Sequence, residues 1–335
     1  MTLSGRKVVV TGGAGFIGSE VVRQALDGGA RVTAIDNLVN GKRDNLDGLD
    51  GKHLTVAIED IRNRDCMADL LNGADIVFHL ACLGLRHSIH SPRENHDVNA
   101  TATLDLLQLA HSTGVKGFVQ VSSSEVYGSA TTARMGEDHP TRPTTVYGAS
   151  KLAGEGYARA YWETYRYPTV VVRPFNAFGP RSHHEGDCGE VIPKFMLRAL
   201  AGEPLVIFGD GEQTRDFTFV SDTARGILAA AVGNAAWGET INIGSGRETS
   251  INDLARDVSA LVGIPVNIVH DKPRPGDVRR LCADTGKARA LLGFEATVGL
   301  SEGIAQLKAW YANSGRSPDD LLREDIVHNW QPATP

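Results

Sequence analysis

The feature that most constrains this 335-residue chain is a short strand that runs directly into a glycine-rich turn and then into a helix. Val8-Val9-Val10-Thr11 has the composition of a buried strand, and Gly12-Gly13-Ala14-Gly15-Phe16-Ile17-Gly18 follows at once. A helical pattern opens at Ser19-Glu20-Val21-Val22. Gly-x-Gly-x-x-Gly in this context is the fingerprint of a turn that holds the pyrophosphate of a dinucleotide against a helix N-terminus. The chain is therefore predicted to begin with a dinucleotide-binding βαβ unit.

Strand-like and helix-like stretches alternate through the first half of the chain. The expected strands are rich in β-branched residues and cover residues 7–10, 31–35, 54–58, 76–80, 117–121 and 169–173. Apolar strands separated by helices are typical of a parallel sheet covered on both faces, so we expect an α/β fold of the doubly wound, Rossmann type.

The pattern becomes irregular and rich in Pro and Gly after Arg173-Pro174, which predicts a smaller, interleaved C-terminal substrate domain. Residues 1–177 are expected to form the dinucleotide-binding domain, completed by about 217–246, where one more helix and strand return to the main sheet. Residues 178–216 and 247–313 are assigned to the second domain. Residues 314–335 are polar and charged, and we expect them to form a surface tail.

Composition excludes several classes of partner. Lys and Arg number 34 against 40 Asp and Glu, a net charge of −6, so no broad cationic surface is available for nucleic acid. No apolar run approaches the ~20 residues of a membrane-spanning helix. Cys66, Cys82, Cys188 and Cys282 form no C-x-x-C pair, which argues against a disulfide framework or a zinc site. With no secretion signal after Met1, we expect a cytoplasmic protein that holds no metal.

An acidic residue at the end of the second expected strand narrows the choice of dinucleotide. Asp36 lies 18 residues past Gly18, near the ~20 expected for a carboxylate that accepts hydrogen bonds from the adenosine ribose. A carboxylate there repels a 2′-phosphate, so the sequence favours NAD, with Lys42 and Arg43 keeping NADP as the alternative. Asp60-Ile61 and Leu80-Ala81 end the third and fourth strands, where such sheets bind their ligands, and we assign them to adenine and ribose contacts.

Tyr147 and Lys151 are the candidate catalytic pair. They lie four residues apart in a stretch that is helical by composition, so both side chains project from one face. An ammonium beside the phenol, with a nicotinamide cation nearby, would favour the phenolate and lower its pKa from about 10. A hydroxyl from Ser122-Ser123-Ser124, at the end of the fifth strand, would bond the same substrate oxygen. An exposed helical pair is the alternative interpretation of Tyr147 and Lys151.

The succession of these motifs resembles the extended short-chain dehydrogenase/reductases, in particular the NAD-dependent nucleotide-sugar epimerase/dehydratase family. The resemblance spans about residues 6–312 and continues through residues 173–181, 208–222, 242–246 and 274–279. It implies that Tyr147 removes the proton of the sugar 4-hydroxyl while the C4 hydride passes to tightly held NAD⁺. Lys151 would hold the ribose, and Ser123 or Ser124 would bind the 4-oxygen. The family also implies a homodimer that pairs through the helices near residues 95–111 and 149–165.

The resemblance carries over a set of cofactor contacts and a set of substrate contacts. The expected cofactor contacts come from the strand ends and the first helix: Gly12, Gly15, Phe16, Ile17, Gly18, Asp36, Asn37, Asp60, Ile61, Leu80, Ala81, Asn99, Ser122, Tyr147 and Lys151. The expected contacts to a nucleotide-diphosphate sugar are Asn176, Val191, Ile192, Phe208, Gln213, Arg215 and Arg274, with Arg86 and His87 lining the sugar pocket.

Several of these residues have other interpretations. Arg215 and Arg274 suit a diphosphate because a guanidinium meets phosphate oxygens in pairs, but either arginine could instead form an ion pair with Asp210, Asp216 or Asp277. Arg86 and His87 could serve only to start a helix. The run His183-His184-Glu185-Gly186-Asp187-Cys188 offers several metal-ligand types, although adjacent side chains of one loop rarely converge on a single ion.

Glu125 bears on the reaction that follows oxidation at C4. It stands in Ser-Ser-Ser-Glu-Val-Tyr-Gly, where the family's dehydratases and decarboxylases carry a glutamate. A 4-keto group acidifies C5–H, so a carboxylate near C5 would promote loss of the 6-hydroxyl, or of CO₂ from a uronic acid. The sequence therefore favours C5 chemistry, with Ser124 where dehydratases of thymidine sugars have an aspartate. The alternatives are 4-epimerisation, which needs no further base, and a non-catalytic NAD-binding module.

Overall fold

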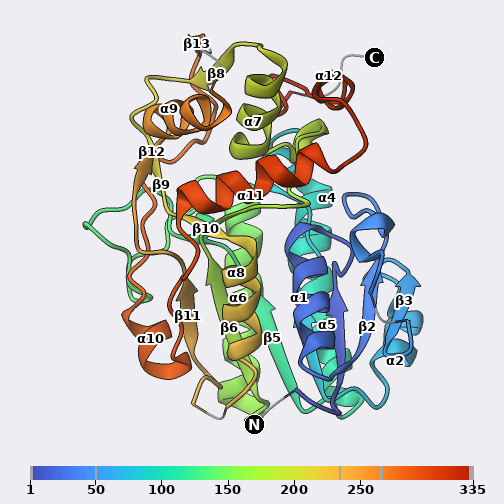
Figure 1. Cartoon of the computed structure of the whole chain (residues 1–335). Helices are drawn as coiled ribbons and strands as arrows, with labels where there is room; N and C mark the ends of the chain where they lie inside the picture. The colour runs from blue at the N-terminus through green and yellow to red at the C-terminus, as the bar shows by residue number, and fades with distance from the viewer. Residues whose placement is uncertain (1–2, 50, 234, 264–266, 332–335) are drawn as a thin grey trace.

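Seven parallel strands form the centre of the molecule, and the central strands are buried on both faces because their apolar residues form near-continuous runs. The computed structural model describes residues 3–49, 51–233, 235–263 and 267–331. The strand order is β11-β6-β5-β4-β1-β2-β3 (Figure 1). The strands are β1 (Lys7–Thr11), β2 (Arg31–Asp36), β3 (Leu54–Ile58), β4 (Ile76–His79), β5 (Gly117–Val121), β6 (Thr169–Pro174) and β11 (Thr240–Ile243). Every pair is parallel, which confirms the predicted doubly wound sheet.

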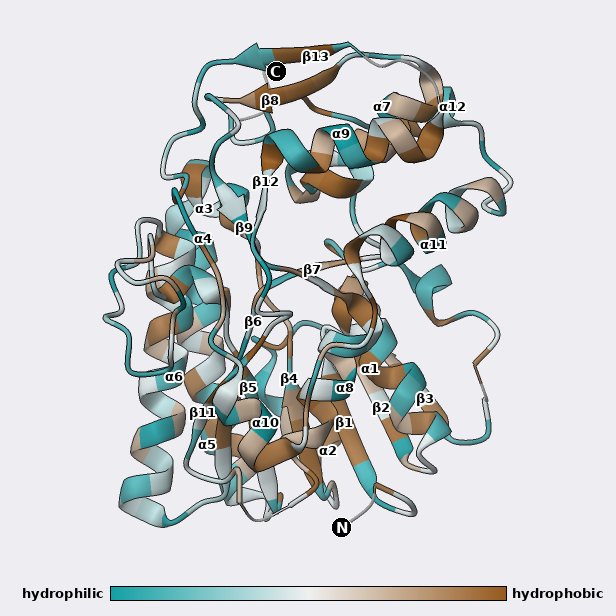
Figure 2. Ribbon diagram, turned by 60° about the vertical axis from the view of Figure 1, so that its left-hand side comes forward, coloured by the Kyte–Doolittle hydropathy of each residue, from teal (hydrophilic) through white to brown (hydrophobic). Residues whose placement is uncertain are grey.

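Each face of the sheet has its own apolar core. Val8 and Val10 of β1 pack into one core and Val9 into the other, since successive side chains of a strand point to opposite faces. Figure 2 shows the resulting hydrophobic strands at the centre of the lower lobe. One face is covered by α1 (Phe16–Asp27), α8 (Val220–Ala229) and α10 (Gly286–Leu292), and the other by α2 (Arg64–Leu71), α5 (Ala102–Ser112) and α6 (Val146–Tyr165).

The first helix begins earlier than the sequence pattern indicates. The sequence predicts its opening at Ser19, whereas α1 starts at Phe16, directly after Gly15. Ser19 donates its backbone N–H to the Gly15 carbonyl at 3.0 Å, so the second half of the glycine-rich stretch is already helical turn. Short elements connect the strands on this side of the sheet: η1 (Arg43–Leu46), α3 (Leu85–His90), α4 (Pro92–His96), the π-helical turn η2 (Asp97–Thr101) and η3 (Ser124–Val126).

A second lobe with its own core lies above the carboxyl ends of the strands (Figure 1). Its helices are α7 (Val191–Ala201), α9 (Ile251–Val262), α11 (Leu300–Ala312) and α12 (Pro318–Leu322), preceded by the turn η4 (Gly186–Cys188). Its strands pair in twos: β8 (Leu205–Phe208) with β13 (Ile268–Asp271), β7 (Asn176–Phe178) with β10 (Phe217–Phe219), and β9 (Thr214–Arg215) with β12 (Thr249–Ser250). The chain returns to the main sheet through α8 and β11, which confirms the predicted interleaving.

The prediction of a surface tail from residue 314 onward is wrong for the residues that the structure describes. α12 forms there, and the side chains of Leu321 and Trp330 are buried. Asp325 is also buried and pairs with Lys194 and Arg198 of α7. The many charged residues of the segment concealed this packing, because they form ion pairs while the few apolar residues join the second core. Residues 332–335 lie outside the described residues. None of the helices in the described part of the chain is both long and apolar enough to cross a membrane.

His79 at the end of β4 ties three elements together as a neutral imidazole. Its Nδ1 lies 2.7 Å from the Thr11 hydroxyl of β1, and its Nε2 lies 2.8 Å from the Thr103 hydroxyl of α5. Thr103 donates its own proton to the Asn99 carbonyl, so Nε2 is the nitrogen that carries the hydrogen and Nδ1 accepts from Thr11. Burial lowers the pKa of His79 from 6.5 to about 3.

Acid is expected to destabilise the fold through His79. The unfolded chain binds this proton near pH 6.5 and the folded chain only near pH 3, so the stabilisation is complete above pH 6.5 and is lost as the pH falls toward 3. Between about pH 7 and pH 5 the group should cost about 2 kcal/mol of unfolding free energy. Urea denaturation at both pH values checks this, because His79→Gln should lose less stability than the wild type over the interval. An equal loss in both proteins would contradict it.

The contact between α1 and the preceding turn is expected to tolerate no side chain at position 18. A Cβ added to Gly18 would overlap the carbonyl oxygen of Gly12, which is backbone and has no room to move. We expect Gly18→Ala to lower the unfolding free energy by about 2 kcal/mol or more, as overpacking does. Gly156, exposed on α6 with no atom near its added Cβ, is the matched control, and Gly156→Ala should stabilise by up to about 1 kcal/mol. Thermal melts measure the melting temperature of each variant against the wild type. Similar shifts of the melting temperature in the two variants would refute the prediction.

Candidate active site

A cavity of about 550 Å³ lies between the carboxyl ends of the strands and the second lobe. This volume is in the range of small-molecule and cofactor sites. Of the residues predicted to form the site, all except Asn99 line this cavity. The carboxyl ends of parallel strands meet at one sheet edge, which is why residues so distant in the sequence converge here.

The glycine-rich turn forms one end of the cavity and fits a pyrophosphate. Gly12 has a φ of +68°, and an added Cβ would lie 2.8 Å from the backbone nitrogen of Ala81. Gly15 directly precedes the first turn of α1, whose backbone N–H groups have no partner within the helix. Phe16 and Ile17 of this turn line the cavity. Bare backbone beside a helix N-terminus is suited to bind phosphate oxygens, so the residues present fit a dinucleotide.

Asp36 stands where a carboxylate would meet the adenosine ribose. Its two oxygens accept backbone N–H groups from Ala14 at 3.0 Å and Leu38 at 2.8 Å, which fixes the carboxylate at the end of β2. Burial raises the pKa of Asp36, and the backbone hydrogen bonds act against that shift. Asn37 donates to Asp60 at 3.0 Å, so the ends of β2 and β3 are joined at the cavity edge.

Asn99 is not among the residues that line the cavity, and its assignment as a cofactor contact stays a prediction. The side chain is buried behind the loop that follows β4. Its Oδ1 accepts the Leu83 N–H at 2.8 Å, and its Nδ2 donates to the Leu83 carbonyl at 2.9 Å and to Asn95 at 3.1 Å. These bonds use the amide fully, so Asn99 positions the Leu83 backbone, and Leu83 itself faces the cavity.

Tyr147 and Lys151 lie in the first turns of α6 and line the cavity together, as the spacing predicts. The helix approaches η3 closely because residue 148 is glycine: an added Cβ would lie 2.7 Å from the Glu125 carbonyl oxygen. This approach brings Tyr147 beside Ser123, whose hydroxyl also accepts the Glu125 N–H at 3.2 Å.

The chain alone does not lower the pKa of Tyr147. Burial raises that pKa well above its usual value, and the hydrogen bond with Ser123 lowers it only in part. Lys151 donates its ammonium to the Val121 carbonyl at 2.8 Å. The predicted lowering depends on the lysine together with a nicotinamide cation, and that second positive charge would come from the bound cofactor.

Glu125 reaches the same cavity from η3. Burial raises the pKa of its carboxyl, while the guanidinium groups of Arg215, Arg274 and Arg86 act in the opposite direction. A carboxylate with a raised pKa is a stronger base than an exposed one, and it lies here among positive charges that hold it within the site.

A buried ion pair behind the serine run was not foreseen from the sequence. The Ser122 hydroxyl donates to Glu155 at 2.6 Å, so this side chain points toward α6 although the residue borders the cavity. Glu155 binds Arg173 at 2.6 Å, and Arg173 also donates to the Tyr127 hydroxyl at 2.7 Å. The signal that could have revealed it is spacing, since Glu155 follows Lys151 by one helical turn. This network fixes β6 and α6 relative to the serine run at residues 122–124.

On the side of the cavity where we expect the substrate, Arg215 and Arg274 lie around the carboxylate of Asp277. Arg215 and Arg274 both bind Asp277, at 2.5 Å and 2.6 Å, so the alternative of an ion pair holds for each of them. One carboxylate for two guanidinium groups still leaves a positive charge at the cavity wall. Arg86 faces the cavity too, and within the described residues no ion pair or hydrogen bond engages its guanidinium. Burial lowers the pKa of Arg86 to about 10.

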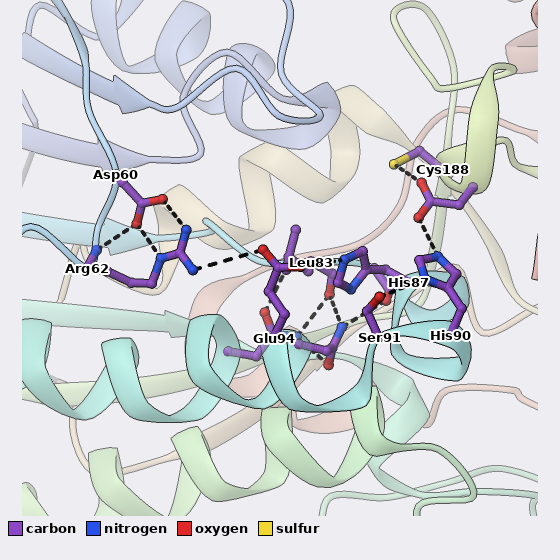
Figure 3. Close-up of polar contacts among 12 residues, drawn as sticks. Asp60, Arg62, Leu83, His87, His90, Ser91, Glu94 and Cys188 are labelled. Atoms are coloured by element: carbon purple, nitrogen blue, oxygen red, sulfur yellow. Dashed lines mark hydrogen bonds and ion pairs between the residues drawn. The ribbon is translucent and has the colours of Figure 1, made fainter. Parts of the chain in front are cut away.

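A chain of polar contacts runs along the rim of the cavity from β3 to η4 (Figure 3). Arg62 binds Asp60 at 2.7 Å and reaches toward Glu94, which lies 3.4 Å from His87. Farther along, His90 contacts Asp187 at 3.1 Å. His87 thus lines the cavity while its Nε2 faces Glu94.

The run at residues 183–188 directs its acidic side chains to separate partners. Glu185 pairs with Lys42 at 2.8 Å, and Asp187 pairs with His90. These contacts fasten η4 to the first lobe on both sides of the cavity. In the part of the chain that the structure describes, no group of three His, Cys, Asp or Glu side chains is arranged to hold a metal ion.

Two further features of the cavity were missed from the sequence. Glu190 precedes α7 and lines the cavity, and burial raises its pKa to about 7. The segment 325–330 supplies Asp325, Val327, Asn329 and Trp330 to the wall. Neither has a local sequence signal, because their position depends on how the second lobe folds over the sheet.

The sequence profile described as the NAD dependent epimerase/dehydratase family matches residues 8–244. A UDP-glucose 4-epimerase of Mycolicibacterium smegmatis is 35% identical over 92% of this chain and 100% of its own length. UDP-glucuronic acid decarboxylase 1 of Xenopus tropicalis is 33% identical over 89% of this chain and 70% of its own. The crystal structure of DesIV, a dTDP-glucose 4,6-dehydratase from Streptomyces venezuelae with NAD bound, has a TM-score of 0.87 at 33% identity, covering 92% of this chain and 97% of that one.

The relatives are named for different reactions, and the DesIV structure has NAD bound. Their similarity extends over nine-tenths of this chain, and the glycine-rich turn, Asp36 and the Tyr147–Lys151 pair stand in one cavity as such an enzyme requires. The chain therefore belongs to the NAD-dependent epimerase/dehydratase family of nucleotide-sugar enzymes, and its cofactor is NAD.

Proposed function

We propose that this protein oxidises a nucleotide-diphosphate sugar at C4 and then carries out proton chemistry at C5, as a dehydratase or decarboxylase does. The observation that carries the proposal is that Glu125 and Tyr147 face one buried cavity, joined by the close contact of α6 with the Glu125 backbone. A 4-epimerase needs the tyrosine but has no task for a second base.

NAD⁺, when bound, supplies the acceptor for the C4 hydride and later returns that hydride where the reaction requires it. With the nicotinamide cation beside it, Tyr147 would act as the phenolate and take the proton of the 4-hydroxyl at its phenolic oxygen. Ser123 and Ser124 bind the 4-oxygen, Ser123 from beside the phenol. The buried site excludes water, which keeps the proton between the sugar and the protein.

Glu125 acts once the 4-keto sugar has formed. In a hexose its carboxylate removes the proton at C5, the C5–C6 double bond forms, and the 6-hydroxyl leaves as water with a proton from the site. In a uronic acid, CO₂ leaves from C5 while the electrons of the broken bond pass into the 4-keto group, and Glu125, here in its protonated form, gives its proton to C5. Burial raises the pKa of the Glu125 carboxyl, which makes the carboxylate a stronger base for the proton at C5.

The charged wall of the second lobe supports a diphosphate substrate. Arg215 and Arg274 share the single carboxylate of Asp277, so N–H groups of both arginines remain for another acceptor. The oxygens of an entering diphosphate would accept charge-assisted hydrogen bonds from them. Asn176 and the first residues of α7, Val191 and Ile192, line the cavity on the same side. Arg86 would contribute a further positive charge near the sugar.

The second candidate function is 4-epimerisation, which the similarity to a UDP-glucose 4-epimerase over the relative's entire length favours. In that case Glu125 would only balance the charge of the surrounding arginines. A non-catalytic NAD-binding protein is the remaining alternative, and the intact pair of Tyr147 and Lys151 argues against it.

Glu125→Gln separates these functions. We expect it to leave the NAD content and the C4 oxidation unchanged while reducing C5 exchange with solvent deuterium by about 100-fold or more, the usual effect of losing a positioned base. The assay incubates protein with UDP-, dTDP-, GDP- and CDP-sugars in water and in deuterium oxide and records product masses. In water, a loss of about 18 mass units indicates dehydration and a loss of about 44 indicates decarboxylation, and about one extra mass unit in deuterium oxide reports the exchange at C5.

Tyr147→Phe is the matched control, because it should bind NAD and abolish both C4 oxidation and every later step. If Glu125→Gln forms a 4-epimerised sugar at the rate of the wild type, the protein is a 4-epimerase instead. No turnover by the wild type on any of the four sugar classes would contradict the proposal altogether.

We also propose that the protein is a homodimer that pairs through α5 and α6. Leu104 and Tyr165 are large apolar side chains exposed on these helices, at 38% and 57%. Tyr165 of α6 stacks on His111 of α5, with ring centroids 5.3 Å apart. Leu104 and His111 lie two helical turns apart on the same side of α5, so these three side chains form one surface across the two helices. Light scattering should give twice the chain mass of 35.9 kDa, and Leu104→Glu with Tyr165→Asp should give the monomer mass. A wild type of monomer mass would overturn this arrangement.

A further inference from the structure

The segment 325–330 near the C-terminus forms part of the cavity wall on the side of the second lobe. Val327, Asn329 and Trp330 line the cavity together with Phe208 and Gln213, the residues that the family resemblance assigns to the nucleotide. Strand β8 therefore meets this segment at the point where a nucleotide would lie.

Two sets of contacts hold the segment in place. The buried Asp325 carboxylate binds Lys194 at 2.8 Å and Arg198 at 2.9 Å, and Lys194 also donates to the Ile326 carbonyl at 2.6 Å. At the other end, Asn329 donates its amide to the carbonyls of Gly186 and Gly189, at 3.2 Å and 3.1 Å. The segment is thus tied to α7 and to the η4 loop, both of which border the cavity.

The aromatic residues of the segment fix the ring of Phe208. Trp330 meets Phe208 edge to face, with ring centroids 4.7 Å apart and an interplanar angle of 87°. His328 packs against Trp330 at 5.4 Å and is itself held by Asp271 of β13 at 2.8 Å. Trp330 is only 7% exposed, whereas Phe208 remains half-buried and faces the cavity. An indole behind a phenyl ring limits the rotation of that ring and leaves its free side available.

We propose that segment 325–330 is part of the nucleotide site, where Trp330 is a positioning residue that holds Phe208 as a stacking surface for the nucleobase. Stacking of a base on an aromatic side chain contributes about 1–3 kcal/mol, and it depends on the ring being held in the correct plane. The inference rests on the proposed function, since it requires a nucleotide-diphosphate substrate. It adds a determinant of nucleotide affinity outside the motifs of the family.

The test compares Trp330→Ala with Trp330→Phe and with Arg323→Ala, a control just before the segment whose side chain is 81% exposed. Calorimetry measures the Kd of UDP, dTDP, GDP and CDP, and absorbance after denaturation measures the NAD content. For the nucleotide that binds the wild type most tightly, Trp330→Ala should raise the Kd about tenfold or more. Trp330→Phe should restore most of the affinity, Arg323→Ala should leave it unchanged, and the NAD content should be the same in all variants.

A second measurement needs no variant. Hydrogen–deuterium exchange of the wild-type peptide that contains residues 325–330 should slow when that nucleotide binds and should not respond to added NAD. An unchanged Kd in Trp330→Ala, or unchanged exchange in the presence of a bound nucleotide, would overturn the inference. Loss of NAD and of thermal stability in Trp330→Ala and Trp330→Phe alike would indicate a merely structural role and overturn it as well. If none of the four nucleotides binds the wild type, the proposed function itself fails.

Discussion

The parallel arrangement of the strands is the constraint from which the site follows. Because β1 to β6 all run in one direction, their carboxyl ends meet at one edge, and the residue that ends each strand is delivered to the same cavity. The tight turn between β1 and α1 is the most demanding part of this edge, since the backbone of Gly12 lies against Ala81 and leaves no room for a side chain. Bare backbone at this point is also what a pyrophosphate needs, so the requirement of packing and the requirement of binding coincide.

Burial of charge gives the cavity its chemical character. Tyr147, Glu125 and Glu190 all have raised pKa values because the second lobe removes them from water, and Arg86 faces the same space without a carboxylate partner within the described residues. Burying such groups lowers the stability of the chain on its own, and of these groups the guanidinium of Arg86 is the one suited to bind an anion. In contrast, the ion pair of Glu155 and Arg173 behind the site is fully partnered and serves to hold the catalytic elements rigid.

The second lobe contributes more to the site than a lid over the sheet would. Its arginines, the first turn of α7 and segment 325–330 form one wall, and an ion pair at Lys42 and a hydrogen bond at His90 fasten the η4 loop to the first lobe. The wall is assembled from residues between 176 and 330, so its geometry depends on the packing of α7, α9, α11 and α12 around a separate core.

Sequence alone determined the features that have a local physical cause. Apolar β-branched runs specify buried strands, the glycine-rich turn specifies the first crossover, and a spacing of four places Tyr147 and Lys151 on one face of α6. Only the tertiary structure decided the rest: that Asn99 supports Leu83 from behind the cavity, that Ser122 points to Glu155, and that the charged segment after residue 314 packs onto the second lobe. The physical reason is that a hydrogen bond or ion pair between residues distant in the chain leaves no periodic pattern. A buried polar side chain therefore shows its partner only once the elements that carry both have been packed together.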